Sequence, residues 1–265
     1  MAARRIAVAA TGEFGADVLE RLAADHDVVQ LFTRPDRPRG RGRKLAPPPA
    51  KAAAERLGIP FEQPAKLDSS VGIAARTVVV CAYGLLIPNE LLERALWLNV
   101  HPSLLPRWRG AAPVERALMA GDEETGVTIH RTVEALDAGP VAAQRAFAIA
   151  PEDDAGVVYA RAAEVAAELL RDVLAHDDPS FEPQPDEGAT YAEKIRPEDR
   201  ELDPDAPAQE LVDRVRALSP HIGARLGELL VWRARVGEDG SFEPVEVQPA
   251  GGRRMPYDAY LRGRR

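Results

Sequence analysis

The chain has 265 residues, of which 45% are apolar and 29% are charged, enough to bury the core of one large domain or of one domain with a smaller appendage. Its 34 Lys and Arg residues and 42 Asp and Glu residues give a formal charge of −8, which excludes a protein that is basic overall but allows a local basic patch. The single cysteine, Cys81, excludes a disulfide framework and a zinc site built from several thiolates.

The first hundred residues alternate short apolar runs with helical patterns. The runs predict strands at residues 6–10, 27–33, 78–83 and 97–101, and the patterns between them predict helices that include 17–22, 49–57 and 88–95. Such alternation is typical of βαβ units, whose parallel sheet is covered on both faces. We therefore predict an α/β fold with an open, mostly parallel, Rossmann-like sheet.

The rest of the chain changes character near residue 177. Before it, the pattern predicts strands at 126–133 and 141–149 and an Ala-rich helix at 154–174. Residues 177–207 are rich in proline and acids, which predicts an irregular connection over the surface. A helix through Leu211, Val215 and Leu218 and a half-buried strand at 230–236 follow. We place an N-terminal domain at 1–188, a linker at 189–205 and a C-terminal domain at 206–265.

The first strand-to-helix turn is the place where a dinucleotide-binding fingerprint would occur. The dinucleotide fingerprint needs three glycines, whereas the turn Thr11-Gly-Glu-Phe-Gly15 supplies two and adds the negative charge of Glu13. We therefore interpret this turn as one that needs glycine for its own backbone.

Three polar side chains suggest acyl-transfer chemistry. Asn99 and His101 stand two apart on a predicted strand, so they share a face near its carboxyl end, where open α/β sheets place ligands. Asp137 follows in a Leu-Asp-Ala-Gly-Pro turn. An amide and an imidazole can donate to a developing oxyanion, and a carboxylate can accept the proton of an attacking amine. Taken alone, a histidine at a strand end is more often a packed residue than a catalytic one.

The residues around this trio resemble the folate-dependent formyltransferases, and within them the members that act on methionyl-tRNA. The motifs of the superfamily are Asn99–Pro113, with the letters NVHPSLLPRWRGAAP, together with Gly121-Asp122, Thr125–Ile129 and Leu136–Pro140. The stretches that match the tRNA-dependent members are Thr33–Lys44, Ala189–Ile195 and Glu246–Met255. The resemblance covers nearly the whole chain.

The resemblance implies specific roles. Asn99, His101 and Asp137 match the catalytic trio of the family, and Ser103, Leu104, Leu105 and Pro106 match the segment that lines the folate pocket. The donor would be 10-formyltetrahydrofolate, and the acceptor would be the α-amino group of methionine on initiator tRNA, for translation initiation. No metal is implied, and the sequence holds no cluster with metal-ligand spacing.

A basic loop precedes the second predicted helix. It contains six positively charged residues and one acid, Asp36, so its local charge is +5 although the chain as a whole is acidic. In the family resembled, this loop enters the acceptor end of tRNA, and arginine suits phosphate and base contacts. The predicted tRNA-binding residues are Arg34, Arg37, Arg39, Arg41, Arg43 and Lys44.

The resemblance departs from the family at the C-terminal end. The family has an OB-like barrel there, whereas fewer than sixty residues follow Pro207, too few for a complete five-stranded barrel. We therefore expect a shortened OB-like β domain. Two alternatives stay open: a folate-dependent N-formyltransferase for an amino sugar nucleotide or another small amine, and a non-catalytic binding module.

Lesser expectations concern location and single residues. No apolar stretch reaches membrane-spanning length and the N-terminal run is too short for a signal peptide, so we expect a monomeric cytoplasmic protein without a membrane partner. Cys81 lies in an apolar run, which predicts a buried core residue. We interpret His130, on the face of Thr128, as structural rather than catalytic.

Overall fold

The computed structural model describes residues 3–39, 44–185 and 187–263, which form two compact units. The first unit holds the chain up to Arg109 together with Gly126–Ala146 and Ala160–Ala189, and the second holds Gly110–Thr125, Phe147–Tyr159 and the chain from Thr190 on. The helices are α1 (Glu13–Asp25), α2 (Pro49–Leu57), α3 (Asn89–Leu92), α4 (Pro113–Met119), α5 (Ala155–Leu174), α6 (Ala208–Leu218) and α7 (Tyr257–Arg262), with a 3-10 turn at Glu198–Arg200. Among the residues that the structure describes, no helix has both the length and the apolar composition needed to cross a bilayer.

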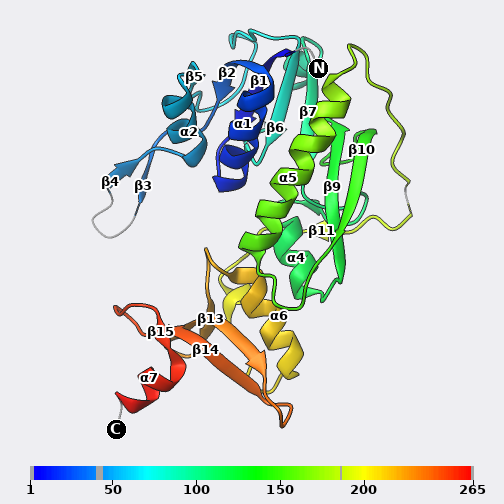
Figure 1. The fold of residues 1–265 in the computed structure, drawn as a ribbon. Helices are drawn as coiled ribbons and strands as arrows, with labels where there is room; N and C mark the ends of the chain where they lie inside the picture. The colour runs from blue at the N-terminus through cyan, green and yellow to red at the C-terminus, as the bar shows by residue number, and fades with distance from the viewer. Residues whose placement is uncertain (1–2, 40–43, 186, 264–265) are drawn as a thin grey trace. The chain divides into compact units, whose positions relative to one another are not determined.

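The first unit is built on a seven-stranded sheet in the order β10-β9-β7-β6-β1-β2-β5 (Figure 1). The strands are β1 (Arg5–Ala10), β2 (Asp27–Phe32), β5 (Phe61–Glu62), β6 (Thr77–Cys81), β7 (Leu96–His101), β9 (Glu124–Arg131) and β10 (Val141–Ala148). The first five in chain order pair in parallel, and β9 runs antiparallel to β7. Because parallel strands are covered on both faces, β1 and β6 are apolar and buried at every position after their first residues, Arg5 and Thr77.

The register of the sheet assembles the polar centre. Asn99 on β7 lies opposite Val80 of β6 on one side and opposite His130 of β9 on the other. His101, two residues further along β7, lies opposite Thr128. Asn99 and His130 are therefore neighbours across the sheet although 31 residues separate them in the chain.

The glycines of the first turn have different roles. A Cβ on Gly15 would come within 2.8 Å of the Cys81 carbonyl oxygen, so this glycine lets α1 approach the sheet closely. Gly12 is the residue before α1, with an ordinary φ of −78° and nothing within 4 Å of a Cβ placed there. The interpretation that the turn needs glycine is thus confirmed for Gly15 and wrong for Gly12.

Several predicted boundaries move for local reasons. The strand predicted to reach Tyr83 ends at Cys81, because Ala82 adopts a φ of +46° that no strand can continue. The helix predicted at 88–95 is reduced to α3, which the indole of Trp97 holds by donating to the Leu91 carbonyl at 2.7 Å. Helix α4 and the hairpin of β3 (Arg37–Arg39) and β4 (Lys44–Ala46) were not predicted.

The second unit contains an antiparallel sheet in the order β12-β13-β14-β15, formed by Ala224–Leu226, Leu229–Val236, Phe242–Gln248 and Met255–Pro256. Helix α6 packs on β13 through Leu211, Val215 and Leu218, as its spacing predicts. The predicted alternation along β13 is wrong at its centre: Val231 and Trp232 are both buried, because a register shift beside Trp232 turns two successive side chains inward. The predicted fold class, a mostly parallel α/β sheet with a small β domain, is confirmed.

Candidate active site

Asn99 and Asp137 meet at the carboxyl end of β7. Asn99 Nδ2 donates to Asp137 Oδ1 at 3.1 Å, and the Asp137 side chain is only 12% exposed. Asp137 itself has a φ of +48°, so the turn after β9 presents its carboxylate toward β7 from an uncommon backbone conformation. The structure therefore brings together the amide and the carboxylate that the sequence predicts as partners.

His130 fixes the orientation of the Asn99 amide. Its Nδ1 lies 3.1 Å from the Arg131 carbonyl, which can only accept, so Nδ1 carries the proton and Nε2 accepts from Asn99 Nδ2 at 3.0 Å. Burial, aided by the nearby His101, lowers the pKa of His130 to about 4, which keeps this ring neutral at pH 7. The sequence interpretation of His130 as purely structural missed this contact with a predicted catalytic residue.

His101 faces the same carboxylate with its other nitrogen. Its Nε2 lies 2.8 Å from the carbonyl oxygen of Trp108, so Nε2 is the donor there. Nδ1 points toward Asp137 Oδ2 at 3.8 Å, and the side chain is 5% exposed. The three predicted residues thus converge, with Asn99 Nδ2 and His101 Nδ1 both facing the Asp137 carboxylate.

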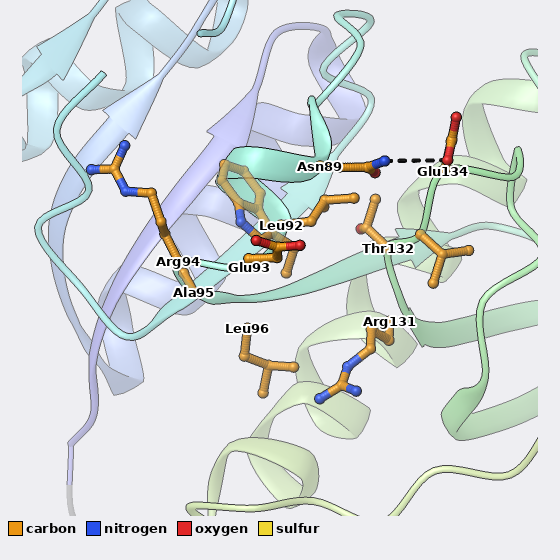
Figure 2. A pocket seen from close by; sticks show the side chains of 11 residues that line it. Asn89, Leu92, Glu93, Arg94, Ala95, Leu96, Arg131, Thr132 and Glu134 are labelled. Carbon is orange, nitrogen blue, oxygen red and sulfur yellow. Dashed lines mark hydrogen bonds between the residues drawn. The ribbon is translucent and has the colours of Figure 1, made fainter. Parts of the chain in front are cut away.

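A pocket of about 520 Å³ lies at the amino end of β7, where α3 and the segment that follows β9 form its walls (Figure 2). Leu92 and Leu96 give it apolar walls, while Thr132 and Glu134 come from the segment that leads to Asp137. Asn89 Nδ2 donates to Glu134 Oε2 at 3.2 Å across one end. Thr132 is one of the lining residues, and its buried hydroxyl has no hydrogen-bond partner among the described residues.

Comparison with known proteins decides the family. A family model described as formyl transferase matches residues 4–174. The chain belongs to the formyl transferase family. The methionyl-tRNA formyltransferase of Halorhodospira halophila is 42% identical over 304 aligned positions, which cover 99% of this chain and 97% of that protein. Since this chain has 265 residues, that relative contains residues without a counterpart here. The resemblance inferred from the motifs is confirmed.

Solved formyltransferases share the fold. The methionyl-tRNA formyltransferase from Clostridium thermocellum has a TM-score of 0.64 at 16% identity and covers 93% of this chain and 98% of its own. The N-formyltransferase from Helicobacter canadensis, in complex with folinic acid and dTDP-3-aminofucose, has a TM-score of 0.68 at 15% identity, with coverages of 89% and 88%. At these identities the likeness concerns the architecture alone.

In this formyl transferase, the segment predicted to line the folate pocket makes mainly internal contacts. Ser103 is fully buried and its hydroxyl donates to the Arg107 carbonyl at 2.7 Å. Leu105 N donates to Thr128 Oγ1, and the Leu105 carbonyl accepts from Gln144. These bonds fix the loop after His101, and a role for Ser103–Pro106 in folate binding stays a prediction.

The predicted tRNA-binding residues divide into two places. Arg37, Arg39 and Lys44 lie on the β3–β4 hairpin, while Arg41 and Arg43 lie outside the described residues. The Asp36 carboxylate accepts from Lys51 Nζ at 2.8 Å, and this bond lowers the pKa of Asp36. Arg34 is separate: its guanidinium donates to the Gly84 carbonyl at 3.3 Å. Nothing in the described part of the chain groups three or more His, Cys, Asp or Glu side chains as a metal site.

Proposed function

We propose that this formyl transferase moves a formyl group from 10-formyltetrahydrofolate to the α-amino group of methionine on initiator tRNA, in the cytoplasm. The observation that carries the proposal is the convergence of Asn99, His101 and Asp137 in a chain that is 42% identical to a methionyl-tRNA formyltransferase over nearly its whole length. The same trio gives any acceptor amine the same chemistry, so the identity of the acceptor depends on the relatives and on the basic hairpin.

The pocket at the amino end of β7 has a size and a lining that suit the pterin end of the donor. A pterin is planar, with apolar faces and a polar edge, and pockets of 300–1,000 Å³ with few polar groups are typical for such ligands. Leu92 and Leu96 would contact the faces, and the unpartnered Thr132 hydroxyl would meet the polar edge.

The hydrogen bonds of Asn99 support a role for the trio in the transfer. One proton of its amide is held by the neutral ring of His130, so the bond to Asp137 Oδ1 is the one that a formyl oxygen can replace. That exchange directs an N–H at the developing oxyanion and frees the Asp137 carboxylate to accept the proton of the attacking amine. A donor of this kind is worth about 3 kcal/mol in the transition state.

His101 and Asp137 would supply the remaining hydrogen-bond donor and the proton acceptor of the reaction. His101 Nδ1 lies 3.8 Å from Asp137 Oδ2, and when it carries a proton it is a second donor to the oxyanion. The amine nitrogen forms a bond to the formyl carbon, the bond from that carbon to the donor nitrogen breaks, and the amine proton ends on the leaving nitrogen. Asp137 is placed to carry that proton between the two nitrogens.

The basic hairpin supports tRNA as the acceptor. Arg37 pairs with Ala46 and Arg39 with Lys44 across β3 and β4, and the side chains of Arg37 and Lys44 are exposed. Because Asp36 is bound to Lys51 on α2, the hairpin keeps its positive charge for a polyanion. Leu45, 72% exposed on the same hairpin, adds an apolar surface on which a base can stack.

One assay tests the proposal. Purified protein is mixed with 10-formyltetrahydrofolate and methionyl-tRNA, and the release of tetrahydrofolate is followed, with uncharged tRNA as the control. Release with charged tRNA alone supports the proposal. Release with an amino sugar nucleotide but not with methionyl-tRNA would assign the second candidate, an N-formyltransferase for a small amine.

A further inference from the structure

We propose that Gln184 is a positioning residue that holds the turn of Asp137 in its reactive place; the inference rests on the proposed function. Gln184 lies in the proline-rich segment that the sequence predicts as an irregular connection. Its side chain binds backbone carbonyls of the turn, and it acts through the backbone that carries the Asp137 carboxylate.

The side-chain amide of Gln184 is fully used. Its Nε2 donates to the carbonyl oxygens of Asp137 at 2.8 Å and of Gly139 at 2.7 Å. Its Oε1 accepts from Arg109 Nε at 3.1 Å and Nη2 at 2.7 Å. Both donors and both lone pairs are therefore engaged, and a flipped amide would set oxygen against two carbonyls and nitrogen against a guanidinium. Only one orientation of this amide is compatible with its surroundings.

The turn that Gln184 holds is one that requires support. Asp137 has a φ of +48°, a conformation that costs a non-glycine residue free energy and persists only when neighbouring contacts fix it. On the other side of the turn, a Cβ at Gly139 would overlap the Arg131 carbonyl, and Arg131 N donates to the Pro140 carbonyl at 2.9 Å. The turn is thus clamped between the end of β9 and the Gln184 amide.

The segment that supplies Gln184 is itself anchored to the same unit. Glu182 and Val141 exchange backbone hydrogen bonds of 2.7 and 2.8 Å at the start of β10. One residue earlier, the Arg131 guanidinium stacks on the Phe181 ring at 4.8 Å from its centroid. Gln184 therefore reaches the Asp137 turn from a fixed base rather than from a free loop.

The geometry predicts which kinetic constant changes. Displacing the Asp137 carboxylate leaves the pocket and the hairpin in place, so substrate binding persists while the proton acceptor is misplaced. Misplacement of a reacting group by about 1 Å can cost about a hundredfold in rate. We expect Gln184→Met, which keeps the length and removes all four bonds, to lower kcat about 10- to 100-fold with each KM changed less than about twofold.

Two further variants separate positioning from general damage. Gln184→Glu keeps the shape and the Arg109 contact but sets oxygen against the carbonyls of Asp137 and Gly139, so it should lower kcat as Gln184→Met does. Glu182→Ala removes an exposed side chain and keeps the backbone bridge, so it should turn over like the wild type. Melting temperatures of all variants are measured beside the rates.

A double-mutant cycle with Asp137→Asn decides whether Gln184 acts through Asp137. In single-turnover assays, Gln184→Met should cost less than about threefold in the Asp137→Asn background, because the group that it positions is already lost. The same fractional loss in both backgrounds, or an unchanged kcat in the wild-type background, would overturn the proposal.

A measurement without any acceptor keeps the test independent of the proposed function. Hydrogen exchange in the peptide 131–141 should become faster in Gln184→Met and stay unchanged in Glu182→Ala. If wild-type protein forms no product with methionyl-tRNA, the proposed function fails, and the cycle is run on whichever amine it accepts. Unchanged exchange in Gln184→Met would refute the role of Gln184 whatever the acceptor.

Discussion

Acidification should destabilise the protein through His130. Its side chain is 2% exposed, and burial lowers its pKa from the ordinary 6.5 to about 4. The unfolded chain therefore binds more protons than the folded chain between these two values, so the free energy of unfolding falls as the pH decreases below 6.5. The loss is complete below about pH 4, where both states are protonated.

The pKa difference gives the magnitude. A difference of about 2.5 units corresponds to about 3 kcal/mol when the proton is fully bound, since each unit contributes about 1.4 kcal/mol. At about pH 5 the unfolded histidine is almost fully protonated and the folded one is still mostly neutral, so about 2 kcal/mol of this is already lost. Asp137 at 3.7 Å opposes the shift, but burial and His101 outweigh it.

Urea unfolding of wild type and of His130→Gln at about pH 7.5 and about pH 5 isolates this contribution. Titrating groups that do not interact with His130 cancel in the difference between the two proteins, which should change by about 2 kcal/mol in favour of the variant on acidification. His176→Gln, which alters an exposed histidine, should follow the wild type. If the difference stays constant with pH, His130 is not held neutral, and the assignment of its Nε2 as the acceptor for Asn99 is refuted.

Four further outcomes are expected. His101→Ala and Asp137→Asn should each lower kcat by about 10²- to 10⁴-fold while folate affinity, measured by fluorescence titration, stays within about threefold; a near-normal rate would remove that residue from the mechanism. Thr132→Val should raise the KM for the donor about three- to tenfold and leave the KM for tRNA unchanged, because it removes the hydroxyl proposed to bind the polar edge of the pterin. Gly139→Ala should lower kcat at least tenfold by pushing the Asp137 turn off the Arg131 carbonyl, whereas Gly72→Ala, with open space around its Cβ, should not. Replacing Arg39, Arg41 and Arg43 with Gln should raise the KM for methionyl-tRNA and flatten its dependence on salt, and an unchanged salt slope would exclude the hairpin from tRNA binding.

The sheet could be predicted from the sequence because its strands are buried on both faces. Continuous apolar runs such as Val78–Cys81 have no polar face that could mislead, and each is followed by a helical pattern or a turn. The predicted end of the third strand and the predicted alternation along β13 were wrong, because local backbone geometry decides both. Ala82 and Trp232 are ordinary residues in sequence, and only packing reveals that one ends a strand and the other follows a register shift.

The trio could be predicted because chemistry restricts it to a few residue types. Asn99 and His101 share a strand face through simple alternation, and the motif around them supplied Asp137. His130 was undervalued because its importance depends on a register: only the pairing of β9 with β7 places it opposite Asn99. From the sequence alone, its apolar strand favours a packed histidine.

Gln184 gives no such signal, for a reason that follows from its partners. Its amide donates to backbone carbonyls 47 and 45 residues away and accepts from a guanidinium 75 residues away. A carbonyl oxygen is present at every position, so no residue type marks the places where a side chain must bind it. A segment that composition describes correctly as irregular can therefore contain a residue on which the Asp137 turn depends, and the fold must be known before that residue can be found.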